Sequence, residues 1–479
     1  MLKTRWLATM MAGLMFVSPT GWTVPPGEVV STVSDQHSVA VTIYNDNLAL
    51  VKDARTVSLG GDFSQLAWRE VSAQMRAETA QLRNLSNPAG FRLLEQNFDF
   101  DLLTPQKLLE KYVGREVSVI RTHPTTGVET RETATVLSTQ DGLVLKFADR
   151  IETGTPGRLA FSGVPDNLRD KPTLVISLIN PKAGPQQLEL SYLTGGLSWR
   201  ADYVAELNAT ENRLDINGWV TLTNQSGAAY PNAKLQLVAG DLNRVQDAPS
   251  GVRTLAMEAK VANPAEMQQE SLFEYHLYSL QHPTTLKENQ TKQVALMSAH
   301  QVPVKKEYLL TGADYYYSAQ HGDLGQKTKV GVFVEFDNKG EGLGIPLPKG
   351  ILRLYKKDSQ GNAQFVGEDR IVHTPKNETV RLKLGDAFDV TADKKQTDFQ
   401  KLAGAGRYNA VFESAYEIVL KNAKPEAVTV TVREPLPGDW TMLSTSHAHS
   451  KTASDTAEWQ IKVPAEGRTT LTYRVRVKY

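Results

Sequence analysis

The sequence predicts a mainly β protein, built as tandem immunoglobulin-like β-sandwiches with a small β-barrel-like insert in the N-terminal half. Three observations carry this prediction: apolar and polar residues alternate in many short segments, turn residues separate these segments, and helical patterns are scarce. In Thr470–Lys478 (TLTYRVRVK), every second residue from Leu471 to Val477 is apolar, and charged residues lie between. Such alternation indicates a sheet with one buried and one wet face, which is typical of antiparallel sheets.

The same alternation predicts strands along the whole chain. They are expected at Val39–Tyr44, Glu116–Arg121, Thr133–Ser138, Leu143–Phe147, Thr173–Leu178, Leu188–Leu193, Lys329–Phe336, Ala427–Val432 and Ala457–Val463. A helix is expected at Pro105–Tyr112, because Thr104 can act as N-cap and proline suits the first helical position. A weaker helical pattern follows Pro264, at Ala265–Phe273.

Shifts in these patterns predict the domain organisation. The predicted parts are a signal peptide at 1–22, an N-terminal sandwich from 38–105 with 166–240, the barrel-like insert at 106–165, a long, partly mobile loop at 241–270, and a C-terminal sandwich at 271–479.

The first residues have the layout of a secretory signal peptide. Lys3 and Arg5 precede the apolar stretch Trp6–Val17, and small residues follow. Twelve residues are too few to span a bilayer as a helix, and no later segment is long and apolar enough, so we expect no transmembrane span. The chain has no cysteine, which suits a large exported bacterial protein without disulfides. We therefore expect a periplasmic or cell-envelope location.

Short internal matches suggest that the two sandwiches are related. The pattern that begins at Pro181 with Gly184 recurs at Pro464 with Gly467, and each leads into an alternating strand. In addition, Trp219–Ser226 and Tyr416–Ala423 each hold a strand that ends in asparagine, followed by a second strand. Strands connected in this way are typical of one edge of an immunoglobulin-like sandwich.

Charge and motifs exclude several classes of function. The 53 basic residues balance 53 acidic ones, whereas nucleic-acid binding needs a concentrated basic surface. The sequence lacks a phosphate-binding loop, a nucleophile elbow and a zinc-protease motif. We therefore predict no cofactor and no nucleic-acid partner.

Two groups of residues invite a metal hypothesis, and for both we favour a structural role. His447 and His449 would share one face of a strand, but zinc needs a third protein ligand and the local sequence is typical of an exposed turn. Asp386, Asp389 and Asp393 could offer carboxylates to calcium, but their spacing matches no EF-hand loop.

Two tyrosine groups are the candidate ligand-binding residues. Tyr315, Tyr316 and Tyr317 are consecutive, and Tyr275 and Tyr278 form the second group. A tyrosine offers a flat apolar face and a hydroxyl, which suits sugar rings and protein interfaces. The alternative is structural, with Tyr316 packed inward and its neighbours covering a sheet edge.

The chain resembles the family known as domain of unknown function 4139, which includes the proteins named mucoidy inhibitor A. The blocks that carry the resemblance are Val41–Arg55 (VTIYNDNLALVKDAR), Leu197–Leu207 (LSWRADYVAEL), Phe273–Leu296 and, above all, Gly344–Thr391. Mucoidy-inhibitor-like members carry a coiled coil between their halves, where this chain has a strand-rich insert. The resemblance implies an all-β C-terminal half and supplies no established chemistry.

Two functional hypotheses follow. The preferred one is a non-enzymatic envelope protein of binding or structural role, whose partner is an envelope protein or a glycan. The alternative is an exported hydrolase that acts on envelope glycan or peptide through carboxylates brought together only by folding. The sequence leaves open whether edge strands pair in a homodimer.

Overall fold

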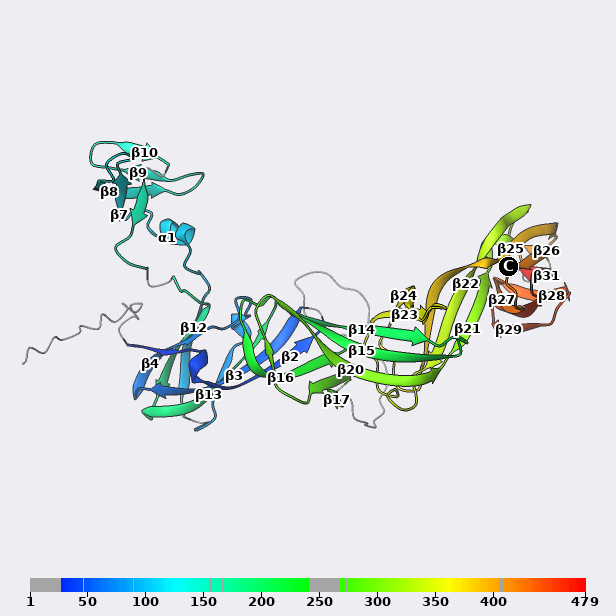
Figure 1. Ribbon diagram of the computed structural model, residues 1–479, viewed down its shortest axis with the longest axis horizontal. Helices are drawn as coiled ribbons and strands as arrows, with labels where there is room; N and C mark the ends of the chain where they lie inside the picture. The colour runs from blue at the N-terminus through cyan, green and yellow to red at the C-terminus, as the bar shows by residue number, and fades with distance from the viewer. Residues whose placement is uncertain are drawn as a thin grey trace, which may run out of the picture. The chain divides into compact units, whose positions relative to one another are not determined.

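The structure is a computed structural model that describes residues 27–45, 47–88, 90–154, 157–165, 168–240, 267–272, 274–404 and 408–479. The signal peptide predicted at 1–22 lies outside the described residues. The regular secondary structure of the described chain is nearly all strand, with one α-helix and three short 3₁₀-helices, so the prediction of a mainly β protein is confirmed (Figure 1).

The chain forms two compact units. The first comprises residues 1–38 and 53–192, and the second comprises 39–52 and 193–479. The chain passes between them three times: within β2 (Gln36–Tyr44), within β3 (Leu48–Leu59) and near the end of β13 (Gly184–Thr194).

The first unit holds a four-stranded sheet in the order β1-β4-β12-β6. These strands are β1 (Glu28–Ser31), β4 (Asp62–Arg69), β12 (Thr173–Asn180) and β6 (Arg92–Asp99). Strand β12 (TLVISLIN) is buried along almost its whole length, because apolar residues occupy both of its faces. In a second sheet, β3, β13 and β5 (Gln81–Asn84) are neighbours in that order.

A buried arginine joins the strands of the first unit. The guanidinium of Arg55 donates to the carboxylate of Asp53 at 2.7 Å and to the carbonyl oxygens of Ser31 and Arg69. Trp68 donates its indole N–H to the same carboxylate at 2.9 Å, and its ring lies 4.6 Å from the guanidinium carbon. Because every charge in this group has partners, it can stay in the core.

The insert has a core of its own. Helix α1 (Pro105–Lys111) begins where predicted, with Thr104 accepting the N–H of Lys107 as N-cap. The sheet order β10-β9-β8-β7-β11 stays open between its outer strands among the described residues. The strands are β7 (Glu116–Thr122), β8 (Glu129–Ser138), β9 (Val144–Lys146), β10 (Ile151–Thr153) and β11 (Arg158–Ala160). Tyr112, Leu145 and Phe147 are buried at their centre.

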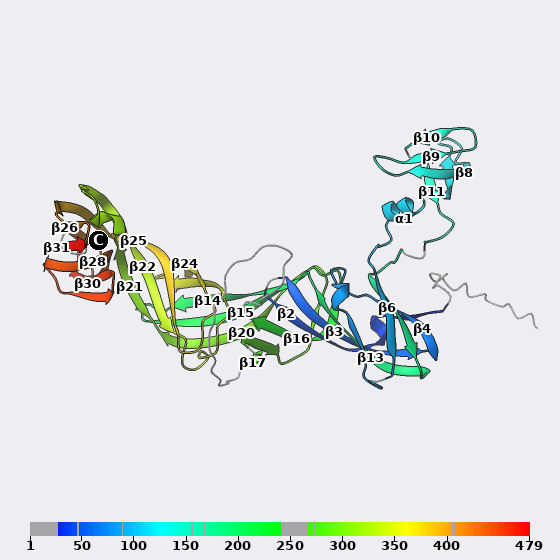
Figure 2. The same ribbon diagram turned by 180° about the vertical axis from the view of Figure 1, so that it is seen from behind.

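The second unit begins with two sets of strands (Figures 1 and 2). One set has the order β17-β18-β16-β2, with β19 beside β16, and the other has the order β20-β15-β14-β23-β24. Trp199 of β14 is buried and donates its indole N–H to the carbonyl oxygen of Val238 in β16, so the two sets face each other. Their bounds are β2 (Gln36–Tyr44), β14 (Leu197–Leu207), β15 (Arg213–Asn224), β16 (Tyr230–Ala239), β17 (Met267–Leu272), β18 (Tyr275–Leu280), β19 (Thr284–Leu286), β20 (Gln290–Pro303), β23 (Gly350–Lys357) and β24 (Ala363–Ile371).

The C-terminal strands form one continuous sheet of nine strands, in the order β28-β31-β26-β25-β22-β21-β27-β30-β29. Only residues 446–448 separate β28 from β29, so the sheet folds back until its two ends are neighbours in sequence. Where the sequence predicts a sandwich of two sheets, hydrogen bonding therefore joins the faces into one nearly closed sheet. The strands are β21 (Lys305–Thr311), β22 (Asp323–Asp337), β25 (Thr379–Leu402), β26 (Val411–Asn422), β27 (Val428–Pro435), β28 (Asp439–Thr445), β29 (His449–Ala453), β30 (Thr456–Val463) and β31 (Gly467–Lys478).

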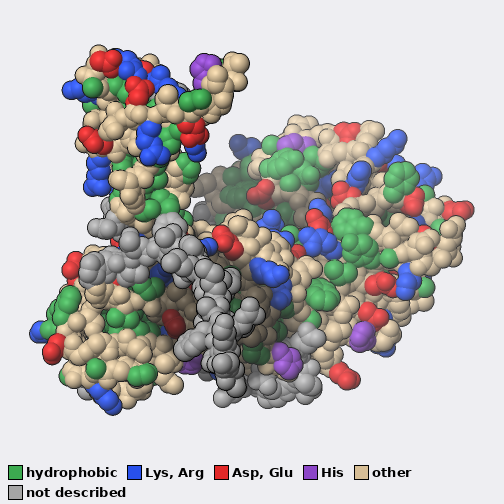
Figure 3. All heavy atoms as spheres, turned by 60° about the vertical axis from the view of Figure 1, so that its left-hand side comes forward, with side chains coloured by type: hydrophobic (Ala, Val, Ile, Leu, Met, Phe, Trp, Pro, Cys, Tyr) green, Lys and Arg blue, Asp and Glu red, His purple; other side chains and the backbone are tan. Residues whose placement is uncertain are grey.

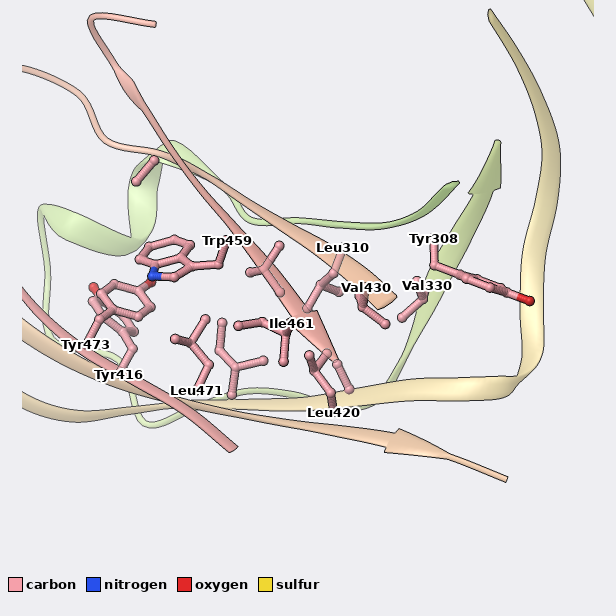
Figure 4. Close-up of a cluster of buried hydrophobic side chains, with 14 of the residues drawn as sticks. Tyr308, Leu310, Val330, Tyr416, Leu420, Val430, Trp459, Ile461, Leu471 and Tyr473 are labelled. Carbon is pink, nitrogen blue, oxygen red and sulfur yellow. The ribbon is translucent and has the colours of Figure 1, made fainter. Parts of the chain in front are cut away.

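This sheet encloses a large apolar core (Figure 4). The rings of Trp459, Tyr416 and Tyr473 gather at one end, and aliphatic side chains such as Ile461 and Leu471 fill the middle. Trp459 also donates its indole N–H to Thr445 Oγ1 at 3.1 Å, which ties β30 to the other end of the sheet.

Two buried asparagines support the predicted internal repeat. Asn224 ends β15 and Asn422 ends β26, and both are almost fully buried. Each side-chain oxygen accepts the backbone N–H two residues later, and each amide donates to the carbonyl four residues later and to one distant carbonyl. The two turns that follow these strands are therefore built in the same way.

The weaker predicted helix is wrong. Of Ala265–Phe273, the described residues form β17, which pairs with β18 in an antiparallel ladder. Cross-strand pairing with the next segment of the chain outweighs a weak local helical pattern. The loop predicted at 241–270 lies outside the described residues up to 266, and its last four residues belong to β17.

We predict that Asn422→Ala and Asn224→Ala each lower the free energy of unfolding by about 1–3 kcal/mol, because each leaves buried backbone groups without partners. Asn97→Ala, at an exposed position of β6, is the control and should change it by less than about 0.5 kcal/mol. Urea unfolding followed by tryptophan fluorescence measures all three. Equal effects at the three sites would contradict the proposed role of the caps.

Candidate functional site

The three consecutive tyrosines lie on a 3₁₀-helix, Asp314–Tyr317, which follows β21. A 3₁₀-helix has three residues per turn, so successive side chains point in different directions. Tyr315 is 58% exposed, Tyr316 is half-buried and Tyr317 is fully buried. The structural alternative named Tyr316 as the inward residue, and the structure assigns that position to Tyr317.

Beneath this turn lies a buried polar cluster. Glu434 of β27 is fully buried, and Lys394 of β25 donates to both of its carboxylate oxygens at 2.6 Å. The Tyr317 hydroxyl donates to the same carboxylate at 2.8 Å and lies 2.9 Å from the hydroxyl of Tyr473. Burial lowers the pKa of Lys394, and the charge of Glu434 opposes this effect. Burial, followed by the nearby charge of Glu434, raises the pKa values of Tyr317 and Tyr473 well above the ordinary value.

Gly312 makes room for this carboxylate. A Cβ atom at this position would overlap the carboxyl group of Glu434, so any other residue would displace it. The glycine between β21 and the tyrosines is thus required by the charged pair beneath it.

Gln396 and Tyr416 fix the turn from below. The amide of Gln396 donates to the carbonyl oxygens of Tyr316 and Ala319, and its oxygen accepts the N–H of His321 at 2.6 Å. The Tyr416 hydroxyl donates to the carbonyl oxygen of Tyr316 at 2.6 Å. The backbone of the turn is therefore held by side chains of the core.

Above this support, three rings form what we call the Tyr315 surface: Tyr315, Tyr316 and His321. The ring centroids of Tyr315 and Tyr316 are 4.7 Å apart, and the His321 ring lies 5.7 Å from Tyr315 and 6.4 Å from Tyr316. The Lys394 ammonium lies 4.2 Å from the centroid of Tyr316. Chemically, the surface offers apolar ring faces, two hydroxyls and an imidazole, which can stack on and hydrogen-bond to a ligand.

The second predicted tyrosine group lies on β18 and is divided by burial. Tyr278 is buried, donates its hydroxyl to the carbonyl oxygen of Pro346 at 2.8 Å and lies 6.4 Å from the Trp199 ring. Burial raises its pKa above the ordinary value. Tyr275 is half-buried and packs where a Cβ atom on Gly240 would touch its ring. This second group therefore offers a single partly exposed ring, whereas the Tyr315 surface offers several adjoining rings.

A polar cleft of about 300 Å³ lies near the end of β14. Its carboxylates are held by donors: Lys357 lies 2.7 Å from Glu206, and the N–H of Gln301 lies 2.7 Å from Asp215. Asp358 accepts from the Gln364 amide and from the backbone of Asn362, and these bonds lower its pKa. Each of these three carboxylates therefore has a hydrogen-bond donor or a cation as its partner.

Among the described residues, no three metal-ligating side chains lie close enough together to hold an ion. His447 lies in the turn after β28, while His449 begins β29. Asp393 accepts the N–H of Lys327 at 2.8 Å and pairs with Lys421, and Asp386 lies 4.0 Å from the ammonium of Lys383.

Fold and site together define an all-β protein that carries an aromatic surface on a rigid support. The chain belongs to the family described as a domain of unknown function (DUF4139), whose model matches residues 188–479, so the predicted family is confirmed. No curated protein matches the chain. In the part of the chain that the structure describes, no helix has the length and apolar character needed to cross a membrane.

We predict that breaking the buried pair is costly. Lys394→Met or Glu434→Gln should each lower the free energy of unfolding by about 3–5 kcal/mol, because each leaves one buried charge without its partner. The double variant should lose less than the sum of the two. The control is the neighbouring exposed pair: Lys395 lies 2.6 Å from Glu417, and Lys395→Met should cost less than about 1 kcal/mol. Strict additivity in a double-mutant cycle would contradict the coupling.

We also predict loss of stability in alkali. Burial raises the pKa of Tyr416 to about 12 and that of Tyr473 well above the ordinary value, while unfolded tyrosines ionise near pH 10. The folded state therefore keeps protons that the unfolded state releases, so this stability is complete below pH 10 and falls above it. Each such tyrosine adds a slope of about 1.4 kcal/mol per pH unit, and Tyr473→Phe should remove one such slope. Denaturant unfolding between pH 9 and 11.5 measures it, and identical slopes would contradict the prediction.

Proposed function

We propose that the protein is an exported, non-enzymatic binding protein of the bacterial cell envelope, and that the Tyr315 surface binds an envelope glycan or protein. The observation that carries the proposal is the arrangement of the turn. An exposed aromatic edge rests on a backbone that Gln396 and Tyr416 hold in place. A preorganised surface loses little conformational freedom when a ligand binds, and so more of the contact energy appears as affinity.

The support beneath the surface explains why its rings are exposed. The buried carboxylate of Glu434 fixes Tyr317, and a 3₁₀-turn then directs Tyr315 away from the core. What sets Tyr315 apart from a single exposed aromatic residue is that its ring adjoins those of Tyr316 and His321, so the three offer one continuous contact surface. Elsewhere, positive and negative side chains are interspersed over the visible face of the molecule in Figure 3, which agrees with the equal numbers of basic and acidic residues.

Two sequence features support the envelope location. The N-terminal segment has the layout of an export signal, and the chain contains no cysteine. A large β protein with extensive buried cores does not need disulfides for stability outside the cytoplasm.

The alternative, an exported hydrolase, would use the polar cleft near the end of β14. A carboxylate that acts as general acid needs a raised pKa, so that it carries a proton at neutral pH. The donors around Asp358 lower its pKa, and Glu206 is paired with Lys357. These contacts favour binding over catalysis at this cleft.

We predict that Tyr315→Ala and His321→Ala each weaken ligand binding about 2- to 10-fold, which corresponds to the 0.5–1.5 kcal/mol typical of an aromatic contact. The chain from Trp22 onward is first screened by thermal shift against purified envelope glycans, and by crosslinking for protein partners. The binding constant of any hit is then measured for each variant. Phe388→Ala is the control, because Phe388 is 93% exposed and lies outside the cluster. Unchanged binding in both variants would show that the Tyr315 surface is not the binding site.

A further inference from the structure

A separate cleft of about 180 Å³ lies in the second unit. Residues of β21, β22, β23, β24 and β25 line it together with the end of β14. Five aliphatic side chains line it: Leu207, Val332, Val334, Val366 and Leu384. Clefts for drug-sized ligands have about 300–1,000 Å³. This cleft therefore suits a short aliphatic group.

Glu211 lies between two lysines at the polar end of the cleft. The ammonium of Lys306 lies 2.6 Å from one oxygen of this carboxylate, and the ammonium of Lys356 lies 2.5 Å from the other. Burial raises the pKa of Glu211, but the two ammonium groups outweigh it and lower the pKa to about 2. Glu211 is therefore ionised at neutral pH, and with its two lysines it forms a trio of one net positive charge.

The backbone around Glu211 is held in place. Its φ of 57° is in the left-handed region, and the side-chain oxygen of Asn208 accepts the N–H groups of Asn212 and Arg213. Lys306 also lies 5.1 Å from the centroid of the Tyr308 ring. The two ammonium groups are thus positioned at the cleft before any ligand arrives.

The lysines keep donors beyond those that Glu211 uses. An ammonium has three N–H groups; each lysine directs one of them to Glu211, and Lys306 directs a second to Tyr308, so one remains on Lys306 and two on Lys356. Asp386 also lines the cleft, and Lys383 lies 4.0 Å from it. The lining as a whole therefore has two lysines and two carboxylates, and the excess of positive charge is local to the Glu211 end, next to the aliphatic side chains.

We propose that this cleft binds the carboxylate of a short aliphatic acid, with the carboxylate bridging Lys306 and Lys356 and the alkyl chain on the aliphatic wall. Two cations recognise the charge and the wall recognises the chain, so neither a neutral alcohol nor an amine of the same length satisfies both. This site is independent of the Tyr315 surface, and either can fail without the other.

The alternative is that the trio has only a structural role, a brace in which two ion pairs connect β21 and β23 to the turn before β15. The two hypotheses give opposite results for Glu211→Gln. In a binding site, Glu211 competes with the ligand for the same ammonium groups, so its neutralisation raises the net charge from one to two and tightens binding. In a brace, the same change weakens the protein and creates no affinity.

The experiment is a titration of the full chain with hexanoate, followed by methyl NMR signals of Val332, Val334 and Leu384. We expect saturable shifts with hexanoate and none with hexylamine at the same concentration. Lys306→Met and Lys356→Met should each weaken hexanoate binding at least 5-fold, and Glu211→Gln should tighten it at least 3-fold. The control is Lys395→Met, which lies in the same unit but outside the cleft. This variant should bind hexanoate with the same affinity as the protein without substitutions.

Four results would overturn the proposal. They are the absence of saturable shifts with hexanoate, equal affinity for hexanoate and hexylamine, unchanged affinity in both lysine variants, and no gain of affinity in folded Glu211→Gln. The comparison of the two ligands needs no variant, so the test stands even where a substitution impairs folding.

Discussion

The nine-stranded sheet of the second unit depends on one buried ion pair, Lys394 with Glu434. Moving two charges out of water is expensive, and their attraction offsets that cost only when the geometry is good and further hydrogen bonds complete it. Here the ammonium reaches both carboxylate oxygens, Tyr317 supplies another donor, and two tyrosine rings lie near the cation. The pair joins β25 to β27, which are separated by two strands in the order of the folded-back sheet. The pair therefore fixes which strands face each other across the core as the sheet folds back.

Closure of the sheet in turn sets the position of the tyrosine turn. Gly312 must lack a side chain because the carboxylate occupies that space, and Tyr317 must point inward because the carboxylate accepts its hydroxyl. Once those two positions are fixed, a short 3₁₀-turn leaves Tyr315 in solvent. The exposed rings of the surface are therefore a geometric consequence of a charged pair in the core.

Much of the fold could be predicted from the sequence, because alternation depends only on which face of a strand is buried. That rule places Val428, Val430 and Val432 inward, and its continuation also places Glu434 inward; likewise Val390 and Ala392 lead to Lys394. The pair could have been found by accepting charged residues as members of a buried face. The direction of each tyrosine could not, since the turn follows from contacts with β25, β26 and β27. Nor could the cleft beside Glu211, whose lysines come from two strands about fifty residues apart in sequence.

The balance of charge gives the two surfaces different chemistry. With 53 basic and 53 acidic residues, affinity for a ligand cannot come from a general field and must come from local arrangement. At the Tyr315 surface the nearby cation is neutralised by Glu434, so rings and hydroxyl groups remain to make contacts. At the Glu211 cleft one carboxylate faces two ammonium groups, and the excess charge lies against aliphatic side chains. Charge is balanced beneath the Tyr315 surface, which suits it to stacking. Positive charge is in excess around Glu211, which suits the proposed binding of an anion.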